Sequence, residues 1–525
     1  MRRRANPLLL IGLLFTAAAP VTAQQYDVLI RGGRVVDGTG NPWYYADIAV
    51  NGDRIAAVGD LSAATARRVI DASGLYVTPG FIDVHSHAGG GLARETLSHA
   101  RPQLAQGITT VFVNPDGGGP VDMVEQRAAL LRHGLGVNVA QMVPHGSVRG
   151  AVLGADDRAP TAAEMTRMQA MVREGMEAGA FGLSSGPYYA PGSFANTAEL
   201  IELARVAGRY GGVYSSHIRD EADYTIGVVA AVDEVIEVAR EAELPGIVTH
   251  IKALGPRVWG YSAALVKRIE RAREAGIEVY ADQYPYEASS TSLAAALLPR
   301  WAQAGGNDSL NARLSNAEVR ARIRTEMLDN LDRRGGAARI QFASWGPDRT
   351  VEGSTLAEYA ERENLDAVDA ALSMIERSSP SIVSFNMDDD DIELLMRQPW
   401  TMTSSDGTLV EMGSGVPHPR AYGTFPRKLR RYVLERRIIG LEDAIRSMTS
   451  LSAGVMRVRD RGELRAGSFA DILVFDLSRV RDAATYQEPH QLAEGMVHVL
   501  VNGSFAMTDG AFSATLHGRV LSRRE

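Results

Sequence analysis

Short apolar runs alternate with amphipathic segments through the middle of the chain. There are eight such runs: FIDVH at 81, ITTVFV at 108, VNVAQMV at 137, FGLSS at 181, VYSSH at 213, GIVTH at 246, IEVYAD at 277 and WTMTSS at 400. The segments between them, such as residues 161–179, carry apolar residues at helical spacing. Strands that alternate with helices predict a parallel sheet, and eight such units predict an α/β fold of the (β/α)8 (TIM) barrel type over residues 79–455.

The two ends of the chain have a different pattern, with short alternating runs broken by turn residues. Asn51-Gly52 separates two such runs and predicts a β-hairpin. The pattern returns near the C-terminus in ADILVFD and VHVLVNGSFAMTDG. We therefore expect residues 24–78 and 456–525 to build one small β-sandwich domain from both termini.

A long gap separates the seventh apolar run from the eighth. Most connections inside a barrel are far shorter, so this gap indicates an insertion. Its first part has a helical pattern, and we expect an inserted cap at about residues 295–336.

The first 23 residues read MRRRANPLLLIGLLFTAAAPVTA. Three arginines, a short apolar run and small residues before Ala23 are typical of a secretory signal peptide. The apolar run is shorter than the ~20 residues that a spanning helix needs. The sequence therefore predicts a signal peptide at 1–23, cleavage near Ala23 and export to the periplasm or the medium. The alternative is an uncleaved membrane anchor. No later segment is long and apolar enough to predict a membrane span in the mature protein.

Composition narrows the classes of partner. The chain is 45% hydrophobic and 22% charged, as soluble globular proteins are. Its formal net charge of −8 becomes −11 without the three arginines of the leader, which argues against nucleic acid as a partner. There is no cysteine, so neither a disulfide nor a thiolate metal ligand can form.

Histidines gather at the predicted strand ends. Active sites of (β/α)8 barrels lie at the carboxyl ends of the strands. Five of the 11 histidines fall there: His85, His87, His145, His217 and His250. His85 and His87 share one face of their strand, because side chains two residues apart point the same way. The histidines at the strand ends, together with Asp406 after the eighth run, predict a metal site that suits zinc better than nickel, iron or manganese.

Longer motifs extend these strand ends. They are PGFIDVHSH, GITTV, GAFGLSSG, SSHIRDE, THIKALG, DQYPY, SSDG, HPRAYGTFPR and GELRAGSFADILVFD. Together they resemble the N-acyl-D-amino-acid deacylases, or D-aminoacylases, of the amidohydrolase superfamily, along nearly the whole chain after the leader. The resemblance implies a hydrolase of C–N bonds other than peptide bonds, which cleaves the linear amide of N-acyl-D-amino acids. The D configuration rests on the resemblance alone.

The resemblance also implies residue roles. His85, His87, His217 and His250 would be metal ligands, and the expected cofactor is Zn²⁺, one or two ions per chain, with other divalent metals possible. Asp406 would contact the more loosely held metal. It would also act as the general base toward a water molecule whose pKa the metal lowers to near ~7.

One position departs from the family pattern. The deacylases carry a cysteine ligand shortly after GITTV, where this chain has Asp116. Many other amidohydrolases bridge two metals through a carboxylated lysine at the end of strand four, and none is present in FGLSSGPYY. Asp116 is then either the bridging ligand, which we favour, or an ordinary turn residue before glycine with a single metal nearby.

Three residues would bind the substrate. The resemblance assigns a free carboxylate of a small-molecule substrate to Lys252, Tyr284 and Arg420, and an arginine can grip a carboxylate through two parallel hydrogen bonds. Arg420 could instead pair with its own loop, and Tyr284 could pack against the cap. His145 is a candidate to stabilise the oxyanion, and His418 a candidate to support the site from behind.

Three alternatives remain open. A dipeptidase or a cyclic-amide hydrolase of the same superfamily would use similar ligands, although the missing strand-four lysine weakens the cyclic-amide reading. A metal-binding barrel without catalysis is the alternative from another class.

Overall fold

Eight parallel strands form the centre of the molecule. The computed structural model describes residues 25–524, and the predicted leader at 1–23 lies outside the described residues. The barrel strands are β6 (Phe81–Asp83), β7 (Ile108–Val113), β8 (Asn138–Gln141) continued by β9 (Val143–Pro144), β10 (Gly182–Ser185), β11 (Val213–Ser216), β12 (Gly246–Val248), β13 (Val279–Gln283) and β17 (Thr401–Thr403). Each overlaps one of the eight apolar runs. Neighbouring strands pair in parallel in this order.

The barrel closes between its first and last strands. The backbone N–H of Asp406 donates to the carbonyl oxygen of His85 at 2.9 Å, and the N–H of His87 donates to that of Gly407 at 2.9 Å. The Asp83 carboxylate also accepts from the Ser405 N–H at 2.8 Å, between the same first and last strands. The predicted (β/α)8 fold is confirmed.

Helices pack outside these strands. Those outside the insertion are α1 (Gly89–Leu92), α2 (Arg101–Ala105), α3 (Met123–Leu131), α4 (His145–Leu153), α5 (Ala162–Glu177), α6 (Thr197–Arg209), α7 (Val228–Ala242), α8 (Ser262–Glu274), α14 (Asp389–Met396), α15 (Arg420–Arg427), α16 (Leu441–Met448) and α17 (Ser450–Val455). Their apolar faces and the barrel strands share buried clusters, which stabilise the fold by removing apolar surface from water. A capping box, in which Thr161 and Glu164 bond each other's backbone N–H, fixes the start of α5.

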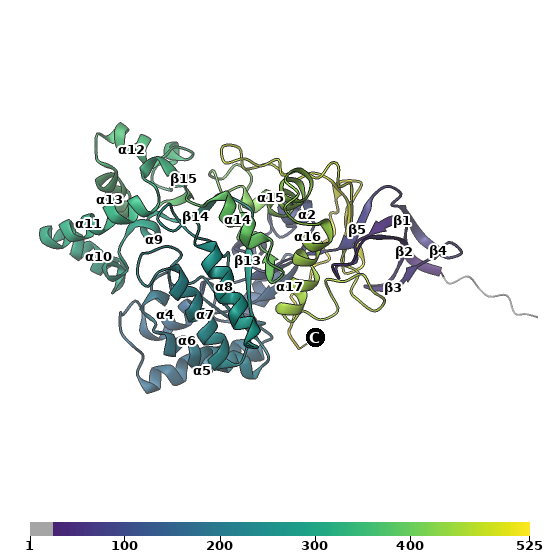
Figure 1. Cartoon of the computed structure of the whole chain (residues 1–525), viewed down its shortest axis with the longest axis horizontal. Helices are drawn as coiled ribbons and strands as arrows, with labels where there is room; N and C mark the ends of the chain where they lie inside the picture. Colours follow the sequence, from purple (N-terminus) through teal and green to yellow (C-terminus); the bar gives the residue numbers. More distant parts are fainter. Residues whose placement is uncertain (1–24, 525) are drawn as a thin grey trace, which may run out of the picture.

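Both chain ends build one β domain, at the right of Figure 1. Its strands are β1 (Gln25–Val35), β2 (Tyr44–Asn51), β3 (Arg54–Gly59), β4 (Thr65–Asp71), β5 (Tyr76–Pro79), β18 (Ile472–Phe475), β19 (Met496–Val501), β20 (Ser504–Thr508) and β21 (Ala511–Phe512). β5 pairs with β18 in antiparallel fashion and so joins the two ends. Hydrogen bonds connect all nine strands into one continuous sheet.

The insertion between β13 and β17 is larger than the 295–336 expected from the sequence (Figure 1, left). It contains β14 (Ala288–Ser292), α9 (Leu293–Leu297), α10 (Gly306–Ser315), α11 (Ala317–Arg333), β15 (Ile340–Ser344), α12 (Leu356–Glu363), α13 (Ala367–Arg377) and β16 (Ser381–Phe385). The three strands form an antiparallel sheet in the order β14-β16-β15. Their segments are short and serine-rich, so the strand signal in the sequence is weak, and the pairing joins residues far apart in the chain. The insertion has its own buried apolar core.

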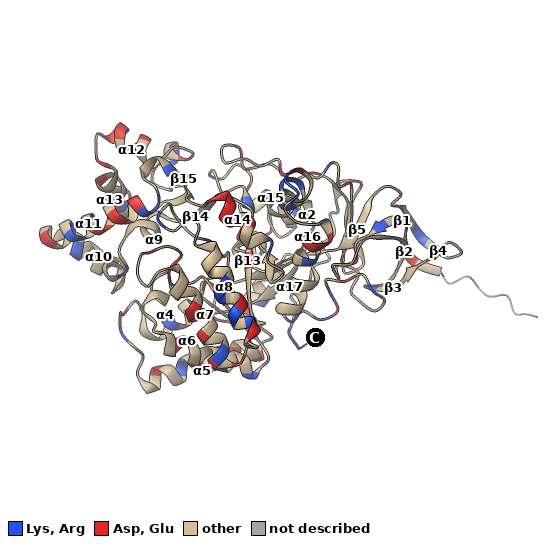
Figure 2. Ribbon diagram, in the orientation of Figure 1, with Lys and Arg blue, Asp and Glu red and all other residues tan. Residues whose placement is uncertain are grey.

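Acidic and basic side chains are interspersed over the outer helices, as Figure 2 shows. The run Asp388–Asp391 lies at the start of α14, where the side chain of Asp388 accepts from the N–H of Asp390. Negative charge at a helix N-terminus is favourable because backbone N–H groups point toward it. Among residues 25–524, no helix is long and apolar enough to cross a membrane.

Candidate metal centre and substrate pocket

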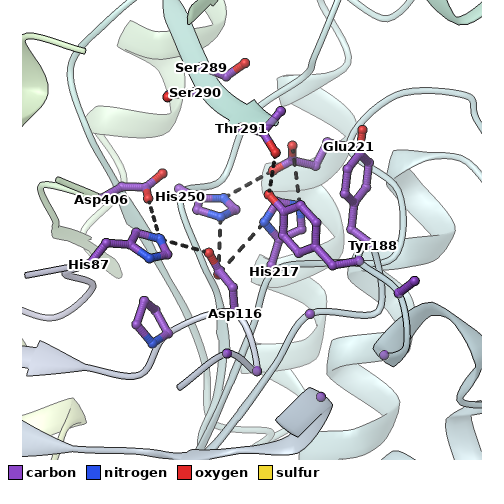
Figure 3. Close-up of a pocket in the computed structure, with 18 of the residues that line it drawn as sticks. His87, Asp116, Tyr188, His217, Glu221, His250, Ser289, Ser290, Thr291 and Asp406 are labelled. Carbon is purple, nitrogen blue, oxygen red and sulfur yellow. Dashed lines mark hydrogen bonds and ion pairs between the residues drawn. The ribbon is translucent and has the colours of Figure 1, made fainter. Parts of the chain in front are cut away.

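Asp116 lies between two groups of histidines at the carboxyl ends of the barrel strands (Figure 3). Its Oδ2 is 3.3 Å from His85 Nε2 and 3.2 Å from His87 Nε2. Its Oδ1 is 3.6 Å from His250 Nε2 and 3.9 Å from His217 Nδ1. The two oxygens of one carboxylate therefore face different pairs of imidazoles.

Asp406 completes the first group. Its Oδ1 lies 3.2 Å from His87 Nε2 and 3.5 Å from His85 Nε2. The donor atoms thus form two sets, one of His85, His87, Asp116 and Asp406 and one of Asp116, His217 and His250, and Asp116 belongs to both. A carboxylate that offers one oxygen to each of two nitrogen-rich sets has the arrangement that a bridging ligand needs.

The buried donor atoms fit divalent metal ions. His85 Nε2, His217 Nδ1 and Asp116 Oδ1 are buried without a hydrogen-bond partner among the described residues. Buried polar atoms are almost always satisfied, so these atoms require a partner of another kind. Burial lowers the pKa of His217 to about 3, which keeps the ring neutral and able to bind a metal. Burial raises the pKa of Asp116, but His85 and the other imidazoles outweigh it and hold this pKa well below the usual range.

Three of these residues have unusual backbone conformations. Asp116, His250 and Asp406 have φ values of 57°, 37° and 49°. Such values are uncommon for residues other than glycine, and each costs of order 1–3 kcal/mol. Because residues directly after a strand would otherwise continue extended, these turns aim the side chains across the mouth of the barrel.

The loop that carries Asp116 packs closely on the end of β10. The Ser184 hydroxyl donates to the Asn114 carbonyl oxygen at 2.6 Å. A Cβ at Gly186 would lie only 2.2 Å from the Asp116 carbonyl oxygen, so only glycine permits this approach. The glycine of the GLSSG motif therefore fixes the position of Asp116.

Glu221 supports the second group of ligands, and sequence reasoning missed it. Its Oε1 lies 3.2 Å from His250 Nδ1, and its Oε2 lies 3.7 Å from His217 Nε2. It also pairs with the buried ammonium of Lys252. A carboxylate behind a metal-binding imidazole orients the ring, here with the opposite nitrogen toward Asp116. The spacing of four residues between His217 and Glu221 in SSHIRDE is the signal that could have revealed it.

One cavity of about 640 Å³ is lined both by candidate metal ligands and by the three residues that were predicted to bind a carboxylate, Lys252, Tyr284 and Arg420. The Tyr284 ring lies near two cations, with Arg420 Cζ 4.6 Å and Lys252 Nζ 5.6 Å from its centroid. Arg420 Nη1 is 2.7 Å from Asp406 Oδ2, so this arginine pairs with Asp406 as well as facing the cavity. The Tyr284 hydroxyl is buried and has no partner among the described residues.

His418 lies directly behind Arg420. Its Nδ1 accepts from the Arg420 N–H at 3.0 Å, and its Nε2 is 2.9 Å from the Ala288 carbonyl oxygen. Burial holds the pKa of His418 well below its usual value, so the neutral ring can accept this bond. His418 therefore tethers the first turn of α15 to β14.

His145 differs from its expectation. Its Nε2 is 3.0 Å from Glu199 Oε1, and it is fully buried outside the cavity wall. The same carboxylate pairs with Arg149. The strand-end pattern suggested a place at the site, but this network turns the ring toward α6 and away from the space where an oxyanion would form.

Sequence reasoning also missed the far wall of the cavity. It consists of Tyr188, Tyr189, Ser289, Ser290, Thr291 and Arg334. The rings of Tyr188 and Tyr189 are tilted against the ring of His217, with centroids 4.9 and 4.6 Å away. They follow the GLSSG motif after one proline, whereas Arg334 comes from the end of α11 and no motif marked it.

These features define a class, a (β/α)8 barrel with a candidate metal centre at the carboxyl ends of its strands. The chain belongs to the amidohydrolase family, whose sequence model matches residues 68–506. It is 37% identical to the N-acyl-D-glutamate deacylase of Alcaligenes xylosoxydans xylosoxydans, over 95% of this chain and 97% of that protein. It is 34% identical to the D-aminoacylase of the same organism, over 95% of this chain and 98% of that protein.

Solved structures agree. The N-acyl-D-glutamate deacylase of Bordetella bronchiseptica, determined with zinc and a phosphonate inhibitor, aligns with a TM-score of 0.82 and 36% identity, over 95% of this chain and all of that one. A D-aminoacylase described as having a binuclear metal centre aligns with a TM-score of 0.81 and 32% identity, over the same shares. The predicted resemblance to the deacylases is confirmed.

Proposed function

We propose that this protein is an exported, metal-dependent hydrolase that cleaves the linear amide of N-acyl-D-amino acids into a carboxylate and a free amino acid. The observation that carries the proposal is Asp116, whose two oxygens face separate pairs of histidines at the floor of a cavity lined by Arg420 and Lys252. The deacylases and D-aminoacylases among its relatives support the choice of reaction. Export rests on the leader pattern at 1–23.

The ligand set favours zinc, in one or two ions per chain. His85, His87, Asp116 and Asp406 would hold one ion, and Asp116, His217 and His250 a second. A ligand set of imidazole and carboxylate groups without a thiolate can also bind other divalent metals. When bound, such a metal polarises the amide carbonyl and makes water acidic enough to react at neutral pH.

Asp406 is the proposed general base. Burial raises the pKa of Asp406, but Arg420 and His85 outweigh burial and hold this pKa well below the usual range. The carboxylate is therefore ionised at neutral pH and can accept a proton from water at Oδ1, which faces His87. It can then deliver this proton to the nitrogen of the leaving amino acid.

Arg420, Lys252 and Tyr284 are proposed to bind the free α-carboxylate. A guanidinium, an ammonium and an unpartnered phenol that surround one part of the cavity offer charge and several donors to an anion. His418 positions Arg420 through its backbone. Fixing the carboxylate fixes the amide relative to Asp406.

The test combines metal content with amine release. Protein purified from the exported fraction is assayed for bound zinc and for release of the amine from matched N-acetyl-D and N-acetyl-L amino acids. Zinc near one or two per chain with D-selective release is expected. Bound metal without release from either series would overturn the proposal and direct the search to dipeptides and cyclic amides.

A further inference from the structure

Arg334 differs from every other buried arginine among residues 25–524. The buried arginines are Arg149, Arg334, Arg420 and Arg461. Arg149, Arg420 and Arg461 pair with the carboxylates of Glu199, Asp406 and Asp471, respectively. Arg334 is only 1% exposed, and no described carboxylate lies within 4.0 Å of it. A guanidinium cannot lose its proton in a protein, so this charge stays in the interior without a carboxylate in direct contact with it.

The contacts of Arg334 are all with neutral groups. Its Nη2 donates to the Tyr188 hydroxyl at 3.1 Å. Its Nη1 lies 3.1 Å from the Asn386 amide oxygen, in the orientation of that amide that satisfies its neighbours. Its Nε is buried without a partner among the described residues. The Nε donor of Arg334 is therefore unused, and its charge has no carboxylate partner in contact.

Arg334 also lines the substrate cavity (wall residues Tyr188 and Ser289–Thr291 are labelled in Figure 3). Ser289, Ser290 and Thr291 add hydroxyl groups to the same wall. Glu221, a carboxylate of the cavity wall, is already paired with Lys252. This end of the cavity therefore presents hydrogen-bond donors around a positive charge that no carboxylate contacts directly.

A second arginine strengthens the positive potential. Arg300 stacks on the Tyr188 ring at 3.9 Å from its centroid. Its Nη1 donates to the backbone carbonyl of Ala295 at 2.9 Å, and no described carboxylate pairs with it. Burial raises the pKa of Tyr188, but Arg334 and Arg300 outweigh burial and lower it overall. The hydroxyl that Arg334 contacts thus lies in a cationic environment.

We propose that Arg334 binds a second carboxylate of the substrate, separate from the α-carboxylate held near Arg420. This inference rests on the proposed function. It names the substrate class as dianionic N-acyl-D-amino acids, in which the second carboxylate belongs either to the amino-acid side chain or to a dicarboxylic acyl group. The cavity, about 640 Å³, has room for either, and the planar guanidinium suits a carboxylate.

The wild-type protein gives the first test. kcat/KM is measured with N-acetyl-D-leucine, N-acetyl-D-glutamate, N-acetyl-D-aspartate and N-succinyl-D-leucine. At least one dianionic substrate is expected to exceed N-acetyl-D-leucine by about 100-fold, because a charge-assisted bond to a buried guanidinium discriminates by roughly this factor. The best substrate shows which part carries the second carboxylate. Equal or better turnover of N-acetyl-D-leucine overturns the inference and leaves the proposed function intact, whereas no turnover of the panel counts against both.

Variants of Arg334 give the second test. In Arg334→Met, the ratio of kcat/KM for the preferred dianionic substrate to that for N-acetyl-D-leucine is expected to fall about 100-fold, mainly through KM. Arg334→Lys is expected to recover part of the ratio, because it restores the charge without the planar fork. The matched control is Arg333→Gln, since Arg333 is adjacent in sequence but pairs with Asp223 and Asp329. An unchanged ratio in Arg334→Met, or an equal fall in the control, overturns the inference, and if Arg334→Met does not fold the wild-type panel decides.

Discussion

Replacing Glu221 by glutamine removes one buried negative charge and changes the shape of the side chain very little. Burial raises the pKa of Glu221, but Lys252 and His217 outweigh it and hold the carboxyl ionised. The variant leaves the ammonium of Lys252, which is 6% exposed, without its counter-charge. It also takes a charged acceptor away from His250 Nδ1.

The structure sets the size of both effects. Removing one partner of a buried ion pair costs about 3–5 kcal/mol, and glutamine keeps an oxygen that can accept from Lys252, so we expect a loss of roughly 2–3 kcal/mol in the free energy of unfolding. Loss of a carboxylate behind a metal-binding imidazole lowers metal affinity by roughly 10–100-fold. The second ligand set should lose its metal first, because Glu221 contacts both of its histidines.

Urea denaturation of metal-free protein measures the first effect, and competition with a chelator measures the second. The double variant Glu221→Gln with Lys252→Met should recover about half of the lost stability, because it removes the unpaired charge. Glu411→Gln is the matched control, since Glu411 pairs with Arg94 at the surface and should change stability by less than about 1 kcal/mol. If Glu221→Gln is as stable as that control and the double variant no better, the buried pair does not have the assigned energetic role.

Three further variants test the site and its support. Asp116→Asn, which tolerates the positive φ, should lower bound metal by at least one ion per chain, and unchanged metal content by elemental analysis would return Asp116 to a turn residue. Asp406→Asn should lower kcat by about 10²–10⁴-fold while the ion of the set Asp116, His217 and His250 stays bound, and near-full activity would contradict its role as the base. Burial lowers the pKa of Lys428 to about 7. Between pH 7 and about 10.5 the unfolded chain therefore binds more protons than the folded one, so the free energy of unfolding should rise with pH, by up to about 1.4 kcal/mol per pH unit. Lys428→Met removes this rise, and identical pH profiles of urea midpoints for both proteins would refute the shift.

The barrel could be predicted because its pattern is local. Each of the eight apolar runs is short, ends in polar residues and precedes a helical segment, so strand identity follows from a few neighbouring residues. The histidines follow from the same logic, since a strand end fixes where a side chain points. The insertion beyond residue 336 lacks such a pattern, because β14 pairs with β16 about ninety residues later and no periodicity records that partner.

The sequence predicted the candidate metal ligands better than the residues whose position depends on neighbouring side chains. His85, His87, His217 and His250 lie at strand ends and converge, as expected. Whether His145 faces the cavity depends on Glu199, which lies on a different helix. Arg334 could not be predicted either. What distinguishes it is that no carboxylate contacts it, and only the folded structure shows which groups lie near it.

The seam that closes the barrel joins residues more than three hundred positions apart. His85 and His87 come from the first strand and Asp406 from the end of the last, and backbone hydrogen bonds link the two across the gap. The first ligand set therefore exists only after the chain has been synthesised and folded almost to its end. An ion held there would bind the closed barrel and not the open one, so it would pull the equilibrium toward closure by mass action. This centre can therefore assemble only when the barrel has folded completely. A chain truncated before residue 400 would lack one of the two strands that close the barrel. Chelation would first expose the junction of β6 and β17 to proteases.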